Sequence, residues 1–112
     1  MDSVNEFDFD EIIGGEDLTI IDFSATWCMP CRLLAPILEQ VADERTDVNF
    51  YNLDIDDNED IAKRYRIFSV PTLMAFRNGE MIDSLVGLNT FDEIMEFIEN
   101  CEAVEDEEDE EE

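Results

Sequence analysis

The hydrophobic positions of this chain form short apolar runs that alternate with stripes at helical spacing. The first run, Leu18–Phe23, is almost continuously apolar, which is typical of a central strand covered on both faces. Val48–Ile55 carries apolar side chains on both faces and predicts a second strand. Thr72–Arg77 and Glu80–Val86 flank Asn78-Gly79, a strong hairpin signal, so we expect these two segments to pair antiparallel.

Helical spacing marks four further segments. The longest runs from about Cys28 to Arg45, and one of its faces carries Leu33, Leu34, Ile37, Leu38, Val41 and Ala42. A capping-box pattern at Ser3–Glu6 predicts a short helix that includes Phe9, Ile12 and Ile13. Another short helix is indicated by Ile61, Ala62 and Tyr65. A second capping box at Thr90–Glu93 opens a final helix with Phe91, Ile94, Met95 and Ile98 facing inward.

The predicted order of elements is helix, strand, helix, strand, helix, strand, strand, helix. Strand–helix–strand units imply parallel pairing through right-handed crossovers, and the final hairpin adds an antiparallel strand. The fold class is therefore α/β, with a central mixed β-sheet flanked by helices on both faces. Chemistry in such sheets tends to lie beyond the carboxyl ends of the strands, and Cys28 lies just past such an end.

The chain has 112 residues, which is enough for one domain with a substantial core. It carries 32 acidic and 6 basic residues, and nine of the acids lie in residues 102–112. We therefore expect a domain over residues 1–101 and an acidic, disordered tail over residues 102–112. The negative charge repels phosphate groups, which argues against nucleic acid and membrane partners. It fits either a salt-rich cytoplasm or a general need for solubility.

Two further absences in the sequence bear on location. No apolar run approaches the length that crosses a membrane, and the first residues lack the basic and then apolar layout of a signal peptide. We therefore expect a cytoplasmic protein.

Cys28 and Cys31 are the leading candidates for chemistry. They lie three residues apart at the start of the long predicted helix, close enough for a disulfide without backbone rearrangement. Unpaired backbone N–H groups and the positive end of the helix dipole favour a thiolate at that point. A thiolate beside a second thiol is the minimal apparatus for thiol–disulfide exchange.

Other polar residues near the pair have alternative interpretations. Asp22 interrupts the first strand and, if buried, would tend to stay protonated and accept a proton from a nearby cysteine. Its position alone slightly favours a strand-end Asp that reaches water. Arg32 is either a partner for the thiolate or a solvated surface residue. Cys101 lies near an apolar stripe and is expected to be a partly buried structural thiol.

A zinc site is disfavoured by the composition, and no other metal centre is predicted. Structural zinc sites need four ligands, usually Cys or His, whereas this chain has three cysteines and no histidine.

The chain resembles the thioredoxin family over nearly all its length, from about Phe7 to Asn100. The residues that carry the resemblance, in the family's order and spacing, are Asp22-Phe23, Trp27–Arg32, Ala35-Pro36, Val70–Thr72, Asn78-Gly79 and Gly87. A Cys-x-x-Cys pair near a strand–helix–strand pattern indicates redox chemistry, and the Val-Pro-Thr downstream makes the match specific. The resemblance implies the thioredoxin fold and a protein-disulfide reductase with no cofactor beyond its Cys28–Cys31 disulfide.

The resemblance also implies roles for individual residues. Cys28 would be the attacking thiolate, Cys31 the resolving thiol, and Asp22 the buried carboxylate that takes the proton of Cys31. Pro71 would be cis, with Val70 presenting its backbone to a substrate strand. The substrate groove would be lined by Trp27, Met29, Pro30 and Gly87. The implied partners are proteins with disulfides and an electron donor of the thioredoxin-reductase type, and we expect a monomer.

Three positions depart from the family pattern. Met29 stands where Gly is usual between the cysteines, which leaves the redox potential open. Ser24 replaces an aromatic residue, and Asn52 falls where many members carry Lys. Loss of that cation would raise the pKa of Asp22 further. Two alternatives stay open: an oxidant or isomerase that uses the same cysteines, and a redox-inactive protein-binding module.

Overall fold

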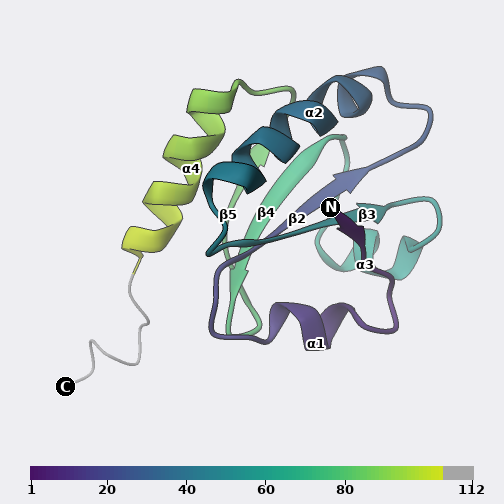
Figure 1. Cartoon of the computed structure of the whole chain (residues 1–112). Helices are drawn as coiled ribbons and strands as arrows, with labels where there is room; N and C mark the ends of the chain where they lie inside the picture. Colours follow the sequence, from purple (N-terminus) through teal and green to yellow (C-terminus); the bar gives the residue numbers. More distant parts are fainter. Residues whose placement is uncertain (105–112) are drawn as a thin grey trace.

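The chain folds around one mixed sheet, seen in the computed structural model, which describes residues 1–104 (Figure 1). Its strand order is β1-β3-β2-β4-β5, with β1, β3 and β2 parallel and β4 and β5 antiparallel to their neighbours. The strand bounds are Asp2–Ser3 (β1), Thr19–Ser24 (β2), Asn49–Asp54 (β3), Thr72–Arg77 (β4) and Glu80–Val86 (β5). The mixed sheet predicted from the sequence is confirmed.

Helices cover both faces of this sheet, as predicted (Figure 1). Their bounds are Phe9–Ile13 (α1), Met29–Glu44 (α2), Glu59–Arg64 (α3) and Phe91–Ala103 (α4). One core lies between the sheet and the pair α2 and α4, and it includes Leu34, Leu38, Ile94 and Ile98. The other lies beneath α1 and α3 and includes Phe9, Ile61 and Phe76. No helix within residues 1–104 is long and apolar enough to cross a membrane.

The alternation of side chains along β2 decides which face carries Asp22. Ile20 belongs to the core beneath α2, whereas Ile21 and Phe23 belong to the opposite core. Because successive side chains of a strand point to opposite faces, Asp22 lies on the α2 side. The strand therefore directs its one carboxylate toward the helix that begins with the cysteine pair.

The first residues form a strand, so the predicted capping box at Ser3–Glu6 is wrong. β1 pairs in parallel with β3, with Ser3 opposite Asn52. The side chain of Asn5 instead accepts hydrogen bonds from the backbone N–H groups of Phe7 and Asp8, at 2.8 and 3.2 Å. The turn that results leads into α1 at Phe9, which is where the apolar spacing placed a helix.

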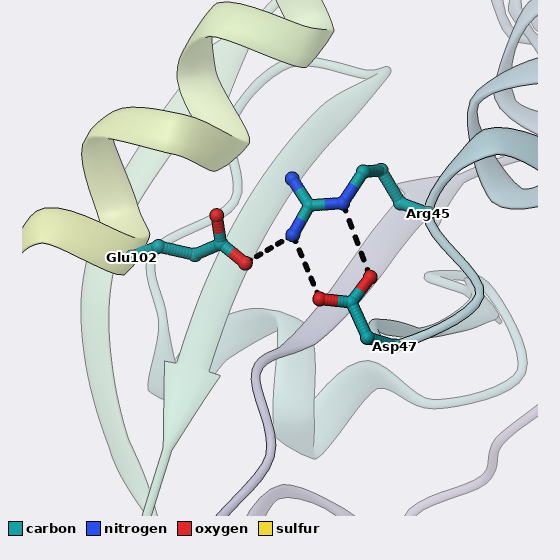
Figure 2. A network of polar contacts seen from close by, with 3 residues as sticks. All are labelled: Arg45, Asp47 and Glu102. Carbon is teal, nitrogen blue, oxygen red and sulfur yellow. Dashed lines mark hydrogen bonds and ion pairs between the residues drawn. The ribbon is translucent and has the colours of Figure 1, made fainter.

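The last helix begins as predicted and extends past the expected end of the domain. Thr90 and Glu93 form a complete capping box at the start of α4. α4 then continues to Ala103, two residues past the expected domain boundary at Cys101. In Figure 2, Arg45, at the end of α2, binds both Asp47 and Glu102 and so ties the end of α2 to the end of α4. The predicted tail otherwise falls on residues 105–112, outside the described residues.

Candidate active site

Cys28 and Cys31 form a disulfide at the start of α2. Cys28 is the N-cap residue, and its Sγ accepts a hydrogen bond from the backbone N–H of Cys31 at 3.2 Å. Their Cα atoms are 5.3 Å apart, as expected for residues three positions apart across a helix start. Pro30 suits the first turn, because the N–H that it lacks would have no partner within the helix. The predicted placement of the pair is confirmed.

The turn between β2 and α2 holds this helix start in place. The backbone N–H of Cys28 donates to the carbonyl of Ala25 at 3.2 Å. The guanidinium of Arg32 donates to the carbonyl of Thr26 at 2.8 Å. Arg32 is thus engaged with the exposed turn. The anion-stabilising groups that the fold supplies to Cys28 are the free N–H groups and dipole of a 16-residue helix.

A loop that is distant from the disulfide in the sequence contacts it in the fold. The Val70–Pro71 peptide bond is cis, as the resemblance implied. The carbonyl oxygen of Val70 lies 3.6 Å from Cys28 Sγ. The backbone N–H of Gly87 donates to the carbonyl of Pro71 at 2.8 Å, and Gly87 adopts a φ of 97°, which a residue with a side chain rarely does. Val70 therefore contacts Cys28, and Pro71 and Gly87 are joined to it through the cis peptide bond and this hydrogen bond.

Two large apolar side chains next to the disulfide are exposed. Trp27 is 65% exposed and Met29 is 58% exposed, and Pro30 is also on the surface. The indole N–H of Trp27 donates to Asp56 Oδ2 at 2.8 Å, which fixes one edge of the ring. Sequence reasoning did not identify Asp56 as part of the site. The feature that could have identified Asp56 is its position in the polar loop after β3, at the carboxyl end of that strand.

Asp22 is buried, with 2% of its surface exposed. The interpretation of Asp22 as a strand-end residue that reaches water is therefore wrong. The residues that surround Asp22 include several from α2 and β3. The sequence of its own six-residue strand therefore does not predict its burial. Burial raises the pKa of Asp22 to about 6, while a hydrogen bond from Asn52 acts in the opposite direction. Its Oδ1 atom has no hydrogen-bond partner among the described residues.

A pocket of about 350 Å³ opens beside this carboxylate. Asp22 and Cys31 both line it, together with Ser24 and Asn52, whereas Cys28 does not. The two cysteines are therefore presented differently: Cys28 lies against the Val70 carbonyl, and Cys31 lies on the side of the buried acid. This asymmetry gives the two sulfurs different chemical surroundings.

The third cysteine lies away from this site. Cys101 is buried in the core between α2, α4 and the sheet, and burial raises the pKa of its thiol to about 11. It is a core residue, and it is more completely buried than the sequence indicated. Within residues 1–104, no group of three or more His, Cys, Asp or Glu side chains is placed to hold a metal ion.

Comparison with known proteins decides what this site belongs to. The thioredoxin family model matches residues 1–100. The chain belongs to the thioredoxin family. It is 40% identical to the thioredoxin of Rickettsia bellii over 100 residues, which is 88% of this chain and 95% of that protein. It is 38% identical to thioredoxin-1 of Saccharomyces cerevisiae over 82 residues, which is 73% of this chain and 80% of the relative.

Solved thioredoxins share the architecture as well. The oxidised mitochondrial thioredoxin 3 of Saccharomyces cerevisiae superposes with a TM-score of 0.82 at 31% identity, covering 89% of this chain and 94% of that one. The thioredoxin of Plasmodium falciparum gives 0.83 at 33% identity, covering 89% and 98%. This thioredoxin-family chain is thus a thiol–disulfide oxidoreductase. Its redox group is the Cys28–Cys31 disulfide, and the family needs no other cofactor.

Proposed function

We propose that this chain reduces disulfide bonds of partner proteins in the cytoplasm, with Cys28 as the nucleophile. The observation that carries the proposal is the asymmetry of the two cysteines. Cys28 caps a helix N-terminus, where its thiolate is stabilised, and lies against the carbonyl of Val70. Cys31 lies in the first turn of the helix and lines the same pocket as Asp22. One sulfur is suited to attack, and the other is suited to give up a proton.

The first step is attack on the substrate. The Cys28 thiolate attacks one sulfur of the substrate disulfide and forms a Cys28–substrate disulfide, and the other substrate sulfur leaves as a thiolate. In the second step Cys31 transfers its proton to Asp22, and its sulfur attacks Cys28 Sγ. The second substrate thiolate leaves, and the Cys28–Cys31 disulfide forms. Two electrons have passed from the cysteine pair to the substrate.

Asp22 suits the role of proton acceptor on physical grounds. A general base works best when its pKa lies near the working pH. With a pKa of about 6, Asp22 is ionised in most molecules at neutral pH and still binds a proton readily. Below pH 6 the carboxylate is protonated, so we expect release of the mixed disulfide to slow as the pH falls through that value.

The substrate groove is formed by the predicted residues around Cys28. We propose that the exposed side chains of Trp27 and Met29 contact the substrate, and that Pro30 and Gly87 flank it. The backbone of Val70, beside Pro71, would pair with an extended substrate strand. Main-chain pairing gives affinity with little dependence on sequence, which suits a reductase with many targets.

The electron donor is proposed to be a reductase of the thioredoxin-reductase type, which would return the Cys28–Cys31 disulfide to the dithiol form. We propose that the chain acts as a monomer, because a net charge of −26 opposes association between identical copies. The cytoplasmic location is supported by the chemistry: a dithiol reductant is maintained in a reducing compartment.

Trapping of the mixed disulfide tests the roles of the cysteines. In Cys31→Ser, the first step proceeds and the second cannot, so we expect a covalent adduct with a model disulfide protein such as insulin, detected by mass spectrometry. Cys28→Ser is the matched control and should give no adduct. Equal trapping by both variants, or by neither, would contradict the assignment.

Measurement of the reduction potential tests the direction of the reaction. Equilibration with glutathione buffers should give a value within the range of the reducing cytosol, about −220 to −320 mV. A value near about −120 mV, typical of a strong oxidant, would instead identify the chain as an oxidant. Met29→Gly is an informative companion, because Met29 lies between the two cysteines.

A further inference from the structure

The side chain of Asn52 bridges two side chains of the neighbouring strand β2. Its Nδ2 group lies 2.7 Å from Ser24 Oγ and 3.3 Å from Asp22 Oδ2. Asn52 is the direct register partner of Asp22 between β3 and β2, so the two side chains lie on the same face of the sheet. Two of the three residues that depart from the family pattern, Ser24 and Asn52, thus meet at the buried carboxylate.

The backbone of Asn52 is held from both sides. β2 lies along one side of it, and β1 lies along the other, where the carbonyl of Asn52 accepts a hydrogen bond from the N–H of Val4 at 2.8 Å. A side chain on a central strand with both edges paired has little freedom to move away. Ser24 accepts from the amide nitrogen, and this contact turns the N–H side of the amide, rather than its oxygen, toward Asp22.

The same residues form a wall of the pocket that Asp22 shares with Cys31. The pocket is large enough for water molecules, and polar groups line it. The charged groups that also line it are Arg32 and Glu39 from α2 and Asp54 from β3, with Met1 at its N-terminal edge. Arg32 is bound to Thr26. Among the described residues, Asn52 is the side chain whose hydrogen bond reaches the Asp22 carboxylate.

We propose that Asn52, held by Ser24, is a positioning residue that stabilises the ionised form of Asp22 by donating to its Oδ2, and leaves Oδ1 to accept the proton. A hydrogen bond to the charged form of an acid favours ionisation, which opposes the effect of burial. Asn52 does not touch the reacting sulfurs and acts only through Asp22. The inference deepens the proposed function, since it rests on Asp22 as the proton acceptor for Cys31.

Titration of Asp22 in the oxidised protein tests this directly. The carboxyl carbon of Asp22 is followed by NMR as a function of pH in wild type, Asn52→Leu and Ser24→Ala. We expect the midpoint to move upward by about one pH unit in Asn52→Leu, since one hydrogen bond to the carboxylate is lost. Ser24→Ala should move it in the same direction by a smaller amount, because the amide is retained but no longer oriented.

Asn49→Leu is the matched control, because Asn49 is an exposed residue of the same strand. Its midpoint should equal that of wild type. If Asn52→Leu gave the same midpoint as Asn49→Leu, the proposal would be overturned. If Asn52→Leu failed to fold, Ser24→Ala would decide: an unchanged or lower midpoint in that variant also overturns the proposal.

A kinetic measurement separates this inference from the proposed function. The pH dependence of mixed-disulfide release should shift upward in Asn52→Leu by the same amount as the NMR midpoint, with the first attack by Cys28 unchanged. A shifted NMR midpoint with an unshifted release profile would support Asn52 as a partner of Asp22 and would refute Asp22 as the proton acceptor. An unshifted NMR midpoint refutes the role of Asn52, whatever the kinetics show.

Discussion

Removing the charge of Asp22 should stabilise the oxidised protein, and the gain should depend on pH. The pKa of Asp22 is raised from the ordinary value of 3.8 to about 6 by burial. Between these two values the folded state holds a proton that the unfolded state releases, so stability falls as the pH rises. Each pKa unit corresponds to about 1.4 kcal/mol, so the full penalty above pH 6 is about 3 kcal/mol.

The variant Asp22→Asn keeps the shape of the side chain and cannot ionise. Relative to wild type, its free energy of unfolding should be higher by about 1 kcal/mol at pH 4.5 and by about 3 kcal/mol at pH 8, because most of the linkage effect develops between these values. The other carboxylates of this acidic chain contribute equally to both proteins, so the difference isolates Asp22.

Guanidinium chloride unfolding of the oxidised proteins from pH 4.5 to 8 measures this difference. Guanidinium chloride is a salt and also screens the surface charges, so the distant carboxylates contribute little to the difference. Asp43→Asn is the matched control: it makes the same charge change at an exposed position of α2 and should stay within about 0.5 kcal/mol of wild type throughout. A difference for Asp22→Asn that is constant with pH, or that shrinks as the pH rises, would refute the reasoning.

Two further predictions concern residues outside the active site. Cys101 should resist alkylation in the folded, reduced protein, because a pKa of about 11 leaves only about one thousandth of the thiol ionised at pH 8. Mass spectrometry after iodoacetamide treatment should show labelling at Cys28 and no labelling at Cys101 until denaturant is added; rapid labelling of Cys101 would contradict its burial. Thr90→Ala should lower the free energy of unfolding by about 1 kcal/mol, because it removes the side chain that accepts from the Glu93 N–H at 3.1 Å. Thr90→Ser should retain most of that stability, and equal losses in the two variants would argue against the cap.

Much of this fold could be predicted from local patterns. The β4–β5 hairpin has the predicted bounds, because Asn78-Gly79 places the turn and the apolar runs on either side set the strand lengths. α2 was predicted to within one residue at each end, because its apolar stripe is long and regular. The sequence of each of these segments is therefore sufficient to predict its structure, without knowledge of what it packs against.

The errors arose where a distant segment decides the structure. The pattern at Ser3–Glu6 fits a capping box locally, but its backbone pairs with β3, about fifty residues away in the sequence. The burial of Asp22 likewise depends on α2 folding back over β2 and on β3 lying beside it. In both cases the local sequence is compatible with two structures. The segment that the tertiary fold brings alongside determines which of them forms.

The contact between Asn52 and Ser24 shows the same limit inside the site. The sequence indicated each residue separately, as a departure from the family pattern, and related only Asn52 to Asp22 through the loss of a cation. Their contact follows from the parallel register of β2 and β3, which places Asn52 directly opposite Asp22 and leaves Ser24 within reach of the amide. Register across a crossover connection is not encoded in either strand alone.

The choice of a neutral partner for Asp22 has a chemical consequence under the proposed mechanism. A cation at position 52 would attract the carboxylate strongly and lower its pKa, which would make it a weaker acceptor for the proton of Cys31. The Asn52 amide offsets only part of the burial effect, so the pKa stays at about 6, close to neutral pH. The same burial that weakens the folded state above pH 6 therefore keeps Asp22 able to take up a proton at the pH where the reaction proceeds.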